Sequence, residues 1–289
     1  MILVTGASGN VSGAVLKSVL ETRSPVTAMY RSEADARNAP TRARTVIADF
    51  GDRESLRLAF AGVDSLFLVC SPVPQLVELE SNAIEAAKAA SVKYLVLNSS
   101  SGAGQWDKSF PKWHNEVERV LRSSGVGHSI VRSNSFMQNI TTYFATTIQT
   151  QDAFYSSMGQ SRASLVDIAD IADVVTALLV SGQPDGSTYE LNGPEALTYY
   201  EVAERISETC GRTIRYIDIP MSEQKKALLG AGMPEWLAQA LLDLQEYYFQ
   251  GNGAALNDDI QRVIGHPPRS LGEFLKANAA AFSKRAATA

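Results

Sequence analysis

The sequence predicts an α/β fold in which a doubly wound parallel sheet carries a smaller, mostly helical lobe. One observation is that short apolar runs rich in β-branched residues alternate with stretches whose apolar side chains recur at helical spacing. Another is a glycine-rich turn, Gly6 to Gly13, that joins the first run to the first helical stretch. Strands that alternate with helices pair in parallel through right-handed crossovers, which gives a doubly wound sheet.

The first part of the chain supplies the elements of this sheet in order. The predicted strands are Ile2–Thr5, Pro25–Tyr30, Thr45–Ala48, Ser65–Cys70, Tyr94–Leu97 and Gly127–Val131. The predicted helices are one from Val11 onward, Glu54–Ala61, Gln75–Ala90, His114–Ser124, and one with the apolar face Ile171, Val174, Val175, Leu178 and Leu179.

The pattern changes from about Gly182. Short strands are predicted at Thr188–Leu191 and Thr213–Asp218, a helix at Tyr199–Cys210, and mostly helix from Ser222 onward. We therefore expect a large domain over residues 1–181 and a smaller lobe over 182–289. Part of 135–165 is expected to contribute to a substrate cleft.

Composition excludes several classes of partner. The 289 residues are 45% hydrophobic and carry a formal charge of −5, so nucleic acid is not expected to bind. Cys70 and Cys210 show neither disulfide nor metal-ligand spacing, so no metal is expected. Thr5-Gly6 interrupts the first apolar run and no run is long enough to span a bilayer. We expect a cytoplasmic monomer or homodimer without a signal peptide or membrane association.

The glycine-rich turn predicts a dinucleotide site. Glycine lets diphosphate oxygens approach the backbone amides at a helix N-terminus, where unpaired N–H groups and the helix dipole attract anions. The expected contacts are Gly6, Ser8, Gly9, Asn10 and Val11. Ser12 stands where a third glycine is usual, and because serine is small we expect little loss of packing. The alternative is a turn that needs positive φ without any ligand.

Arg31 predicts the form of the dinucleotide. An acidic residue after the second strand holds the ribose hydroxyls of NAD, but here the residues are Tyr30-Arg31-Ser32. A guanidinium suits a 2′-phosphate, whereas a carboxylate would repel it. We therefore expect NADP(H) in preference to NAD(H), which stays possible. A solvated surface arginine is the alternative interpretation.

At this point the chain resembles a known family. The motifs that carry the resemblance are Val4 to Val11, Ala48 to Phe50, Leu97 to Ser101, Val131 to Asn139, Val166 to Ala172, Tyr189 to Pro194 and Gly265 to Arg269. They resemble the NmrA-like atypical short-chain dehydrogenases, which include quinone reductases and triphenylmethane dye reductases. The resemblance implies a Rossmann-type domain, a small substrate lobe and an oxidoreductase that binds a nicotinamide cofactor.

The resemblance also implies further cofactor contacts. They are Arg31, Asp49, Phe50, Ser71, Ser99 and His114, with Ser100 beside them. Asp49 has the alternative role of a turn cap. The pair Asp167 and Asp170 precedes a helix and is interpreted as capping rather than as two general acids.

Two positions depart from typical short-chain dehydrogenases. These enzymes use a tyrosine whose pKa is lowered by a lysine four residues later, and the two places here are Phe110 and His114. Phenylalanine cannot donate a proton. His114 is therefore the candidate catalytic residue, with Ser100, although packing at a helix N-terminus is the alternative.

Without a proton donor, the substrate must accept hydride before it is protonated. Quinones, dye cations and extended conjugated carbonyls do so because charge spreads over the acceptor. We expect Trp106, Phe136, Met137 and Tyr143 to line an apolar slot for a small aromatic substrate. Two alternatives stay open: a redox sensor that binds NAD(P) without turnover, and a ring-modifying enzyme of aromatic natural-product biosynthesis.

Overall fold

The computed structural model describes residues 1–284 and divides the chain into two compact units. Unit 1 comprises Met1–Ser133, Ile168–Leu191 and Asp259–His266. Unit 2 comprises Asn134–Asp167, Asn192–Asp258 and the residues from Pro267 onward.

Unit 1 is built on a seven-stranded sheet in the order β3-β2-β1-β4-β5-β6-β8. The strands are β1 (Ile2–Val4), β2 (Val26–Tyr30), β3 (Arg44–Ile47), β4 (Ser65–Leu68), β5 (Tyr94–Ser100), β6 (His128–Ser133) and β8 (Thr188–Leu191). Every pair is parallel; Leu3, for example, stands opposite Thr27 on one side and Leu66 on the other. The doubly wound fold expected from the sequence is confirmed.

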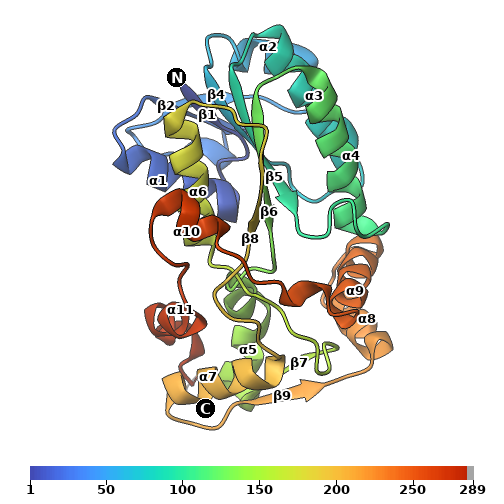
Figure 1. Cartoon of the computed structure of the whole chain (residues 1–289). Coiled ribbons are helices and arrows are strands. Elements are labelled where there is room, and N and C mark those ends of the chain that lie inside the picture. Colours follow the sequence, from blue (N-terminus) through green and yellow to red (C-terminus); the bar gives the residue numbers. More distant parts are fainter. Residues whose placement is uncertain (285–289) are drawn as a thin grey trace. The chain divides into compact units, whose positions relative to one another are not determined.

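Helices cover both faces of this sheet (Figure 1). On one face α1 (Asn10–Glu21) packs against α6 (Ile168–Ser181), and α10 (Asp259–Ile264) contacts α6. On the other face α3 (Leu76–Ala89) contacts both α2 (Arg53–Ala59) and α4 (Ser109–Ser124). Because both faces are covered, β1, β2 and β4 are buried along their whole length, as parallel sheets require.

Helix α4 begins earlier than the sequence predicts. It starts at Ser109 rather than at His114. Pro111 lies in its first turn, where the missing N–H would have had no intrahelical acceptor, so proline is tolerated there. His114 consequently lies more than one turn inside the helix and not at its N-terminus.

The strand Thr188–Leu191 was expected in the smaller lobe, but it extends the sheet of unit 1 as β8, paired with β6. Its partners Ile130 to Ser133 lie far away in sequence. Residues 134–167 conversely belong to unit 2. The structure thus differs from a single boundary near residue 181, because the chain passes between the units several times.

Unit 2 is mostly helical and holds a two-stranded parallel sheet. Its elements are η2 (Ile140–Phe144, a π-helical turn), α5 (Ala145–Gln151), β7 (Ala153–Ser156), α7 (Tyr199–Cys210), β9 (Arg215–Asp218), α8 (Met221–Gly230), α9 (Glu235–Phe249), η3 (Asn252–Ala254), α11 (Leu271–Ala277) and η4 (Ala279–Phe282). Stacked and edge-on rings join Phe144, Phe154, Tyr199 and Tyr216 in its core. Strand β7 was not predicted from the sequence; it pairs with β9, which lies far from it along the chain.

Candidate functional site

The predicted cofactor residues of unit 1 gather at one edge of its sheet. Gly6 lies two residues after β1, and Arg31 comes directly after β2. Asp49 lies two residues after β3, and Ser71 lies three residues after β4. Ser99 and Ser100 are the last two residues of β5. All the strands are parallel, so their carboxyl ends meet at the same edge. The strand order reverses between β1 and β4, which is where doubly wound sheets bind nucleotides.

The turn after β1 has the geometry of an anion cradle. Gly6 has φ +57°, which disfavours any side chain, and a Cβ there would lie 3.4 Å from the carbonyl oxygen of Val69. Gly9 is the N-cap of α1 and offers no side chain to the first turn. The amides of Asn10 and Val11 therefore have no intrahelical acceptor and no side-chain cap, which leaves donors for a diphosphate.

Hydrogen bonds of Thr5 join the carboxyl ends of β1 and β4 next to this turn. The Thr5 hydroxyl donates to the carbonyl oxygens of Phe67 at 3.0 Å and Val69 at 3.2 Å. The N–H of Val69 lies 3.1 Å from the same hydroxyl oxygen, which accepts it. Thr5 is fully buried, so these bonds fix the floor of the turn.

Arg31 and Asp49 lie close to Cys70. The charge of Asp49 raises the pKa of the Cys70 thiol and that of Arg31 lowers it, although burial has the largest effect. Arg31 is exposed and follows the buried Tyr30. The Oδ1 of Asp49 accepts the N–H of Gly51 at 2.7 Å, so the turn-capping interpretation of Asp49 describes a bond that is present. The carbonyl oxygen of Phe50 accepts from the Asn82 amide at 3.1 Å while its ring packs against the core.

The serines of this edge differ in what their hydroxyls do. Ser99 is buried, and its hydroxyl donates to the Glu118 carboxylate at 2.7 Å. Ser100 is partly exposed and donates to its neighbour's carbonyl at 3.1 Å. Ser71 is exposed. Successive residues of a strand face opposite sides, so Ser99 and Ser100 cannot both face one ligand with their side chains.

Helix α4 carries the two positions at which typical short-chain dehydrogenases have a tyrosine and a lysine. Phe110 and His114 lie four residues apart on it, and the Phe110 ring packs edge-on against Trp113. The Nδ1 of His114 is buried without a hydrogen-bond partner. Burial lowers the pKa of His114 to about 4, although the nearby Glu118 charge partly opposes the shift. The imidazole is therefore neutral near pH 7, which weighs against an imidazolium acid.

One buried charged cluster was not predicted from the sequence. The Glu118 carboxylate accepts from Nε of Arg132 at 2.8 Å and from its Nη2 at 2.7 Å, and Arg132 Nη1 donates to Glu190 at 3.0 Å. The hydrogen bond to Glu118 leads the effects that raise the pKa of Arg132. A signal was available, because Glu118 shares the buried helical stripe of Val117 and Leu121.

The candidate substrate residues divide between the units. Trp106 lies in unit 1, where the Lys108 ammonium is 5.4 Å from its ring centre. Phe136, Met137 and Tyr143 lie in unit 2. Met137 is buried and donates its N–H to Val166, while Tyr143 is 53% exposed on the π-helical turn η2. A common aromatic slot stays a prediction.

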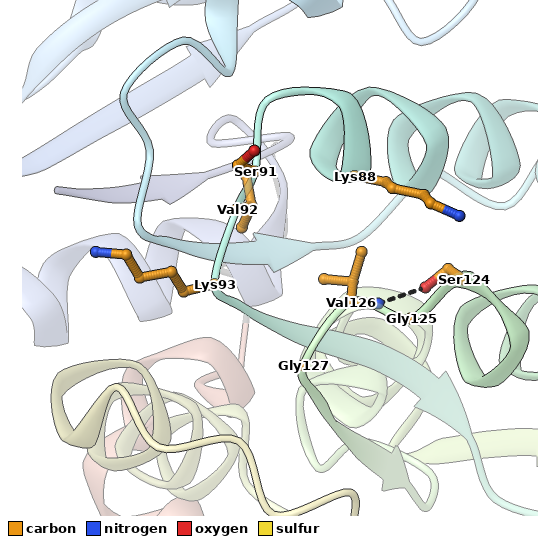
Figure 2. Close-up of a pocket in the computed structure, with 8 residues that line it drawn as sticks. All are labelled: Lys88, Ser91, Val92, Lys93, Ser124, Gly125, Val126 and Gly127. Carbon is orange, nitrogen blue, oxygen red and sulfur yellow. Dashed lines mark hydrogen bonds between the residues drawn. The ribbon is translucent and has the colours of Figure 1, made fainter.

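A separate hollow of ≈ 630 Å³ lies at the amino ends of β5 and β6, the edge opposite to the glycine turn (Figure 2). Lys88, Lys93 and Ser124 are among its lining residues. Lys93 is already paired with Asp64, and the amides of Ser91 to Lys93 and of Val126 already donate within the protein. The hollow therefore has the wrong position and the wrong donors for the nucleotide.

Within residues 1–284, no three His, Cys, Asp or Glu side chains are grouped so as to hold a metal ion. In the same part of the chain, no helix has the length and apolarity to cross a bilayer. Both cysteines are free thiols.

Comparisons with known proteins identify the family and proteins of similar fold. The model of the NmrA-like family matches residues 1–275. An NAD(P)H azoreductase from Xenophilus azovorans is 34% identical over 284 residues, which cover 98% of this chain and 99% of the azoreductase. The NADPH-dependent quinone oxidoreductase 2 of Escherichia coli, solved with NADPH, has a TM-score of 0.88 at 27% identity and covers 96% of this chain and 100% of its own. A triphenylmethane reductase of Citrobacter sp., solved with NADP(H), shares the fold with a TM-score of 0.86 at 24% identity over 96% of this chain and 99% of its own.

Proposed function

The chain belongs to the NmrA-like family, and from this premise we propose that it is a reductase that transfers hydride from NADP(H) to quinone-like or dye-like aromatic acceptors. The family expected from the sequence motifs is confirmed. The chain is an oxidoreductase that uses NADP(H), as expected. The acceptor class and the residues that act on it are the proposed part.

The observation that carries the proposal is the turn Gly6 to Val11. Its positive φ at Gly6, its uncapped helix start and its position at the switch between β1 and β4 together fit a diphosphate. Arg31 is exposed directly after β2, which supports a role in pairing with a 2′-phosphate. When bound, the cofactor supplies the hydride.

The protein's own contribution is orientation rather than proton donation. Phe110 has no proton to give, and the neutral His114 offers an N–H or a lone pair for hydrogen bonding instead of a positive charge. A donor of this kind holds a ribose hydroxyl or an acceptor oxygen in place, and solvent supplies the proton after hydride transfer. Catalysis then depends on holding the reacting carbons at near-attack distance.

The test follows NADPH absorbance with a panel of quinones, azo dyes and triphenylmethane dyes. Steady, acceptor-dependent consumption is the expected result. Tight NADPH binding without consumption would favour the redox-sensor alternative. A changed product without net oxidation of NADPH would favour a ring-modifying enzyme.

Replacing Arg31 by alanine is expected to weaken NADPH binding about 10- to 100-fold and NADH binding less than about threefold, because only NADPH carries the phosphate that a guanidinium holds. The change is measured by titrating cofactor fluorescence. Arg37→Ala, an exposed arginine of the same segment, is the matched control and should leave both affinities unchanged. Equal weakening of both cofactors would contradict a role in binding the phosphate.

Replacing His114 by alanine is expected to lower kcat/KM about tenfold, the value of one hydrogen bond, while His114→Asn recovers part of the loss. The lowered pKa of His114 predicts that the wild-type rate shows no inflection near pH 6.5 from this group. Turnover unchanged in His114→Ala would remove the residue from the mechanism. An inflection near pH 6.5 that disappears in His114→Ala would instead make it an imidazolium acid.

The same pKa shift makes stability depend on pH. The unfolded chain binds a proton at residue 114 below about pH 6.5, whereas the folded chain resists protonation down to about pH 4. The stability contributed by the neutral ring is therefore present above pH 6.5 and is lost as the pH falls toward 4. Urea unfolding should show this loss in the wild type and a smaller loss in His114→Asn.

A further inference from the structure

Glu80 is a buried carboxyl that the proposed mechanism does not use. It lies on α3 with no exposed surface, in the apolar stripe of Leu76, Ala83 and Ala87. Its Oε1 accepts the N–H of Cys70 at 2.9 Å. Its Oε2 is buried and has no hydrogen-bond partner. A carboxyl in such a place requires an explanation, since an unpaired buried charge is costly.

The group that Glu80 holds borders the glycine turn. Cys70 follows Val69, and the Val69 carbonyl oxygen receives the Thr5 hydroxyl and lies 3.4 Å from where a Gly6 Cβ would be. Glu80 of α3, the end of β4 and the turn after β1 thus form one continuous set of contacts. Cys70 is therefore directly bonded to the residue whose carbonyl forms a wall of the glycine turn.

The surroundings favour an uncharged carboxyl. Burial raises the pKa of Glu80 to about 8, and the Cys70 N–H opposes this shift only in part. The other charged groups that act on Cys70 besides Glu80 are Asp49 and Arg31. Burial, and next the charge of Glu80, raise the pKa of the Cys70 thiol to about 12, so the thiol does not titrate in the same range.

We propose that Glu80 is a positioning residue for the nucleotide site: its carboxyl accepts the Cys70 N–H and so fixes the wall of the glycine turn. This inference rests on the proposed function. When Glu80 loses its proton, an uncompensated charge appears inside the protein beside the Cys70 backbone, which borders the glycine turn. Relief of that charge requires water to enter or the Cys70 segment to move, and either change weakens nucleotide binding.

The experiment measures the NADPH dissociation constant by fluorescence between pH 7 and 9.5 in the wild type, Glu80→Gln and Glu80→Met. The wild-type constant should rise about tenfold over this range. Glu80→Gln keeps an acceptor for the Cys70 N–H but cannot ionise, so it should match the wild type at pH 7 and vary much less with pH. Glu80→Met removes the acceptor, and its constant should be raised about fivefold at every pH.

Glu78→Gln, on the exposed side of the same helix, is the matched control and should follow the wild-type curve. Groups that are the same in all variants cancel in the difference between curves. Identical pH curves for the wild type and Glu80→Gln would overturn the role of Glu80 while leaving the proposed function intact. Absence of NADPH binding to the wild type at pH 7 would overturn the proposed function, and this inference with it.

A second measurement uses the protein without nucleotide. Because the folded pKa of Glu80 lies above the unfolded value, the stability of its neutral form is fully present below about pH 4.5 and is lost as the pH rises from there to about 8. Glu80→Gln should therefore gain in urea midpoint relative to the wild type as the pH rises from 6 to 9. A constant difference between the two midpoints would contradict an uncharged Glu80.

Discussion

Replacing Glu118 by alanine is expected to lower the free energy of unfolding by about 3–5 kcal/mol, because it leaves a buried guanidinium without its main partner. Glu118 is only 3% exposed and Arg132 16% exposed. The substitution removes two charge-assisted hydrogen bonds from Arg132 and the acceptor of the buried Ser99 hydroxyl. Urea unfolding followed by circular dichroism measures the loss, and native-state hydrogen exchange should locate it in unit 1.

Two further variants make this prediction specific. Glu116→Ala, on the same helix, should change stability by less than about 0.5 kcal/mol, since Glu116 forms no ion pair within residues 1–284. The double variant Glu118→Met, Arg132→Met should lose less than Glu118→Ala, because the guanidinium is removed together with its buried partner and the other carboxylate that it pairs with, Glu190, is 34% exposed. A loss below about 1 kcal/mol in Glu118→Ala would show that the pair is hydrated rather than buried.

Replacing Gly193 by alanine is expected to cost about 3 kcal/mol or more in unit 2, because the new Cβ meets main-chain atoms that cannot rotate away. An ideal Cβ at this position lies 1.8 Å from the carbonyl oxygen of Leu165 and 2.8 Å from its carbonyl carbon. The Gly193 N–H also donates to the Ser164 oxygen at 3.2 Å, which holds the two segments together. Thermal unfolding and hydrogen exchange of unit 2 measure the effect.

Gly230→Ala is the matched control for this substitution. Gly230 ends α8, has no atom within 4 Å of an added Cβ, and does not need positive φ. Alanine is the better helix former, so the control should be neutral or stabilising by up to about 1 kcal/mol. If Gly193→Ala proved as stable as Gly230→Ala, the close approach of Leu165 would be wrong.

The positions of the cofactor residues could be predicted from the sequence because they follow from topology. Gly6, Arg31 and Asp49 each come after a strand whose β-branched composition is visible in the sequence, and parallel strands place their carboxyl ends at one edge. The start of α4 at Ser109 was missed because Pro111 acts against a helix in most positions and is harmless only in the first turn.

The hydrogen bonds and charge states of the site residues could not be predicted from the sequence. Ser99 and Ser100 are equivalent in the sequence, yet one hydroxyl bonds Glu118 inside the protein and the other bonds a neighbouring carbonyl. The sequence alone predicts an ordinary histidine pKa near neutrality for His114, whereas its burial lowers that pKa to about 4. Glu80 reads as one more acidic residue on an amphipathic helix until it is found with one oxygen on Cys70 and the other unpaired.

The sequence by itself determined the alternation of strands and helices, the glycine turn and the basic residue after the second strand, because these depend on residues close together in the chain. Only the tertiary structure decided that β8 joins β6, that Glu118 binds Arg132, and that Glu80 lies beneath the end of β4. Each of these contacts joins groups brought together by folding. Their charge states depend on burial, which arises only when the sheet and its helices are packed.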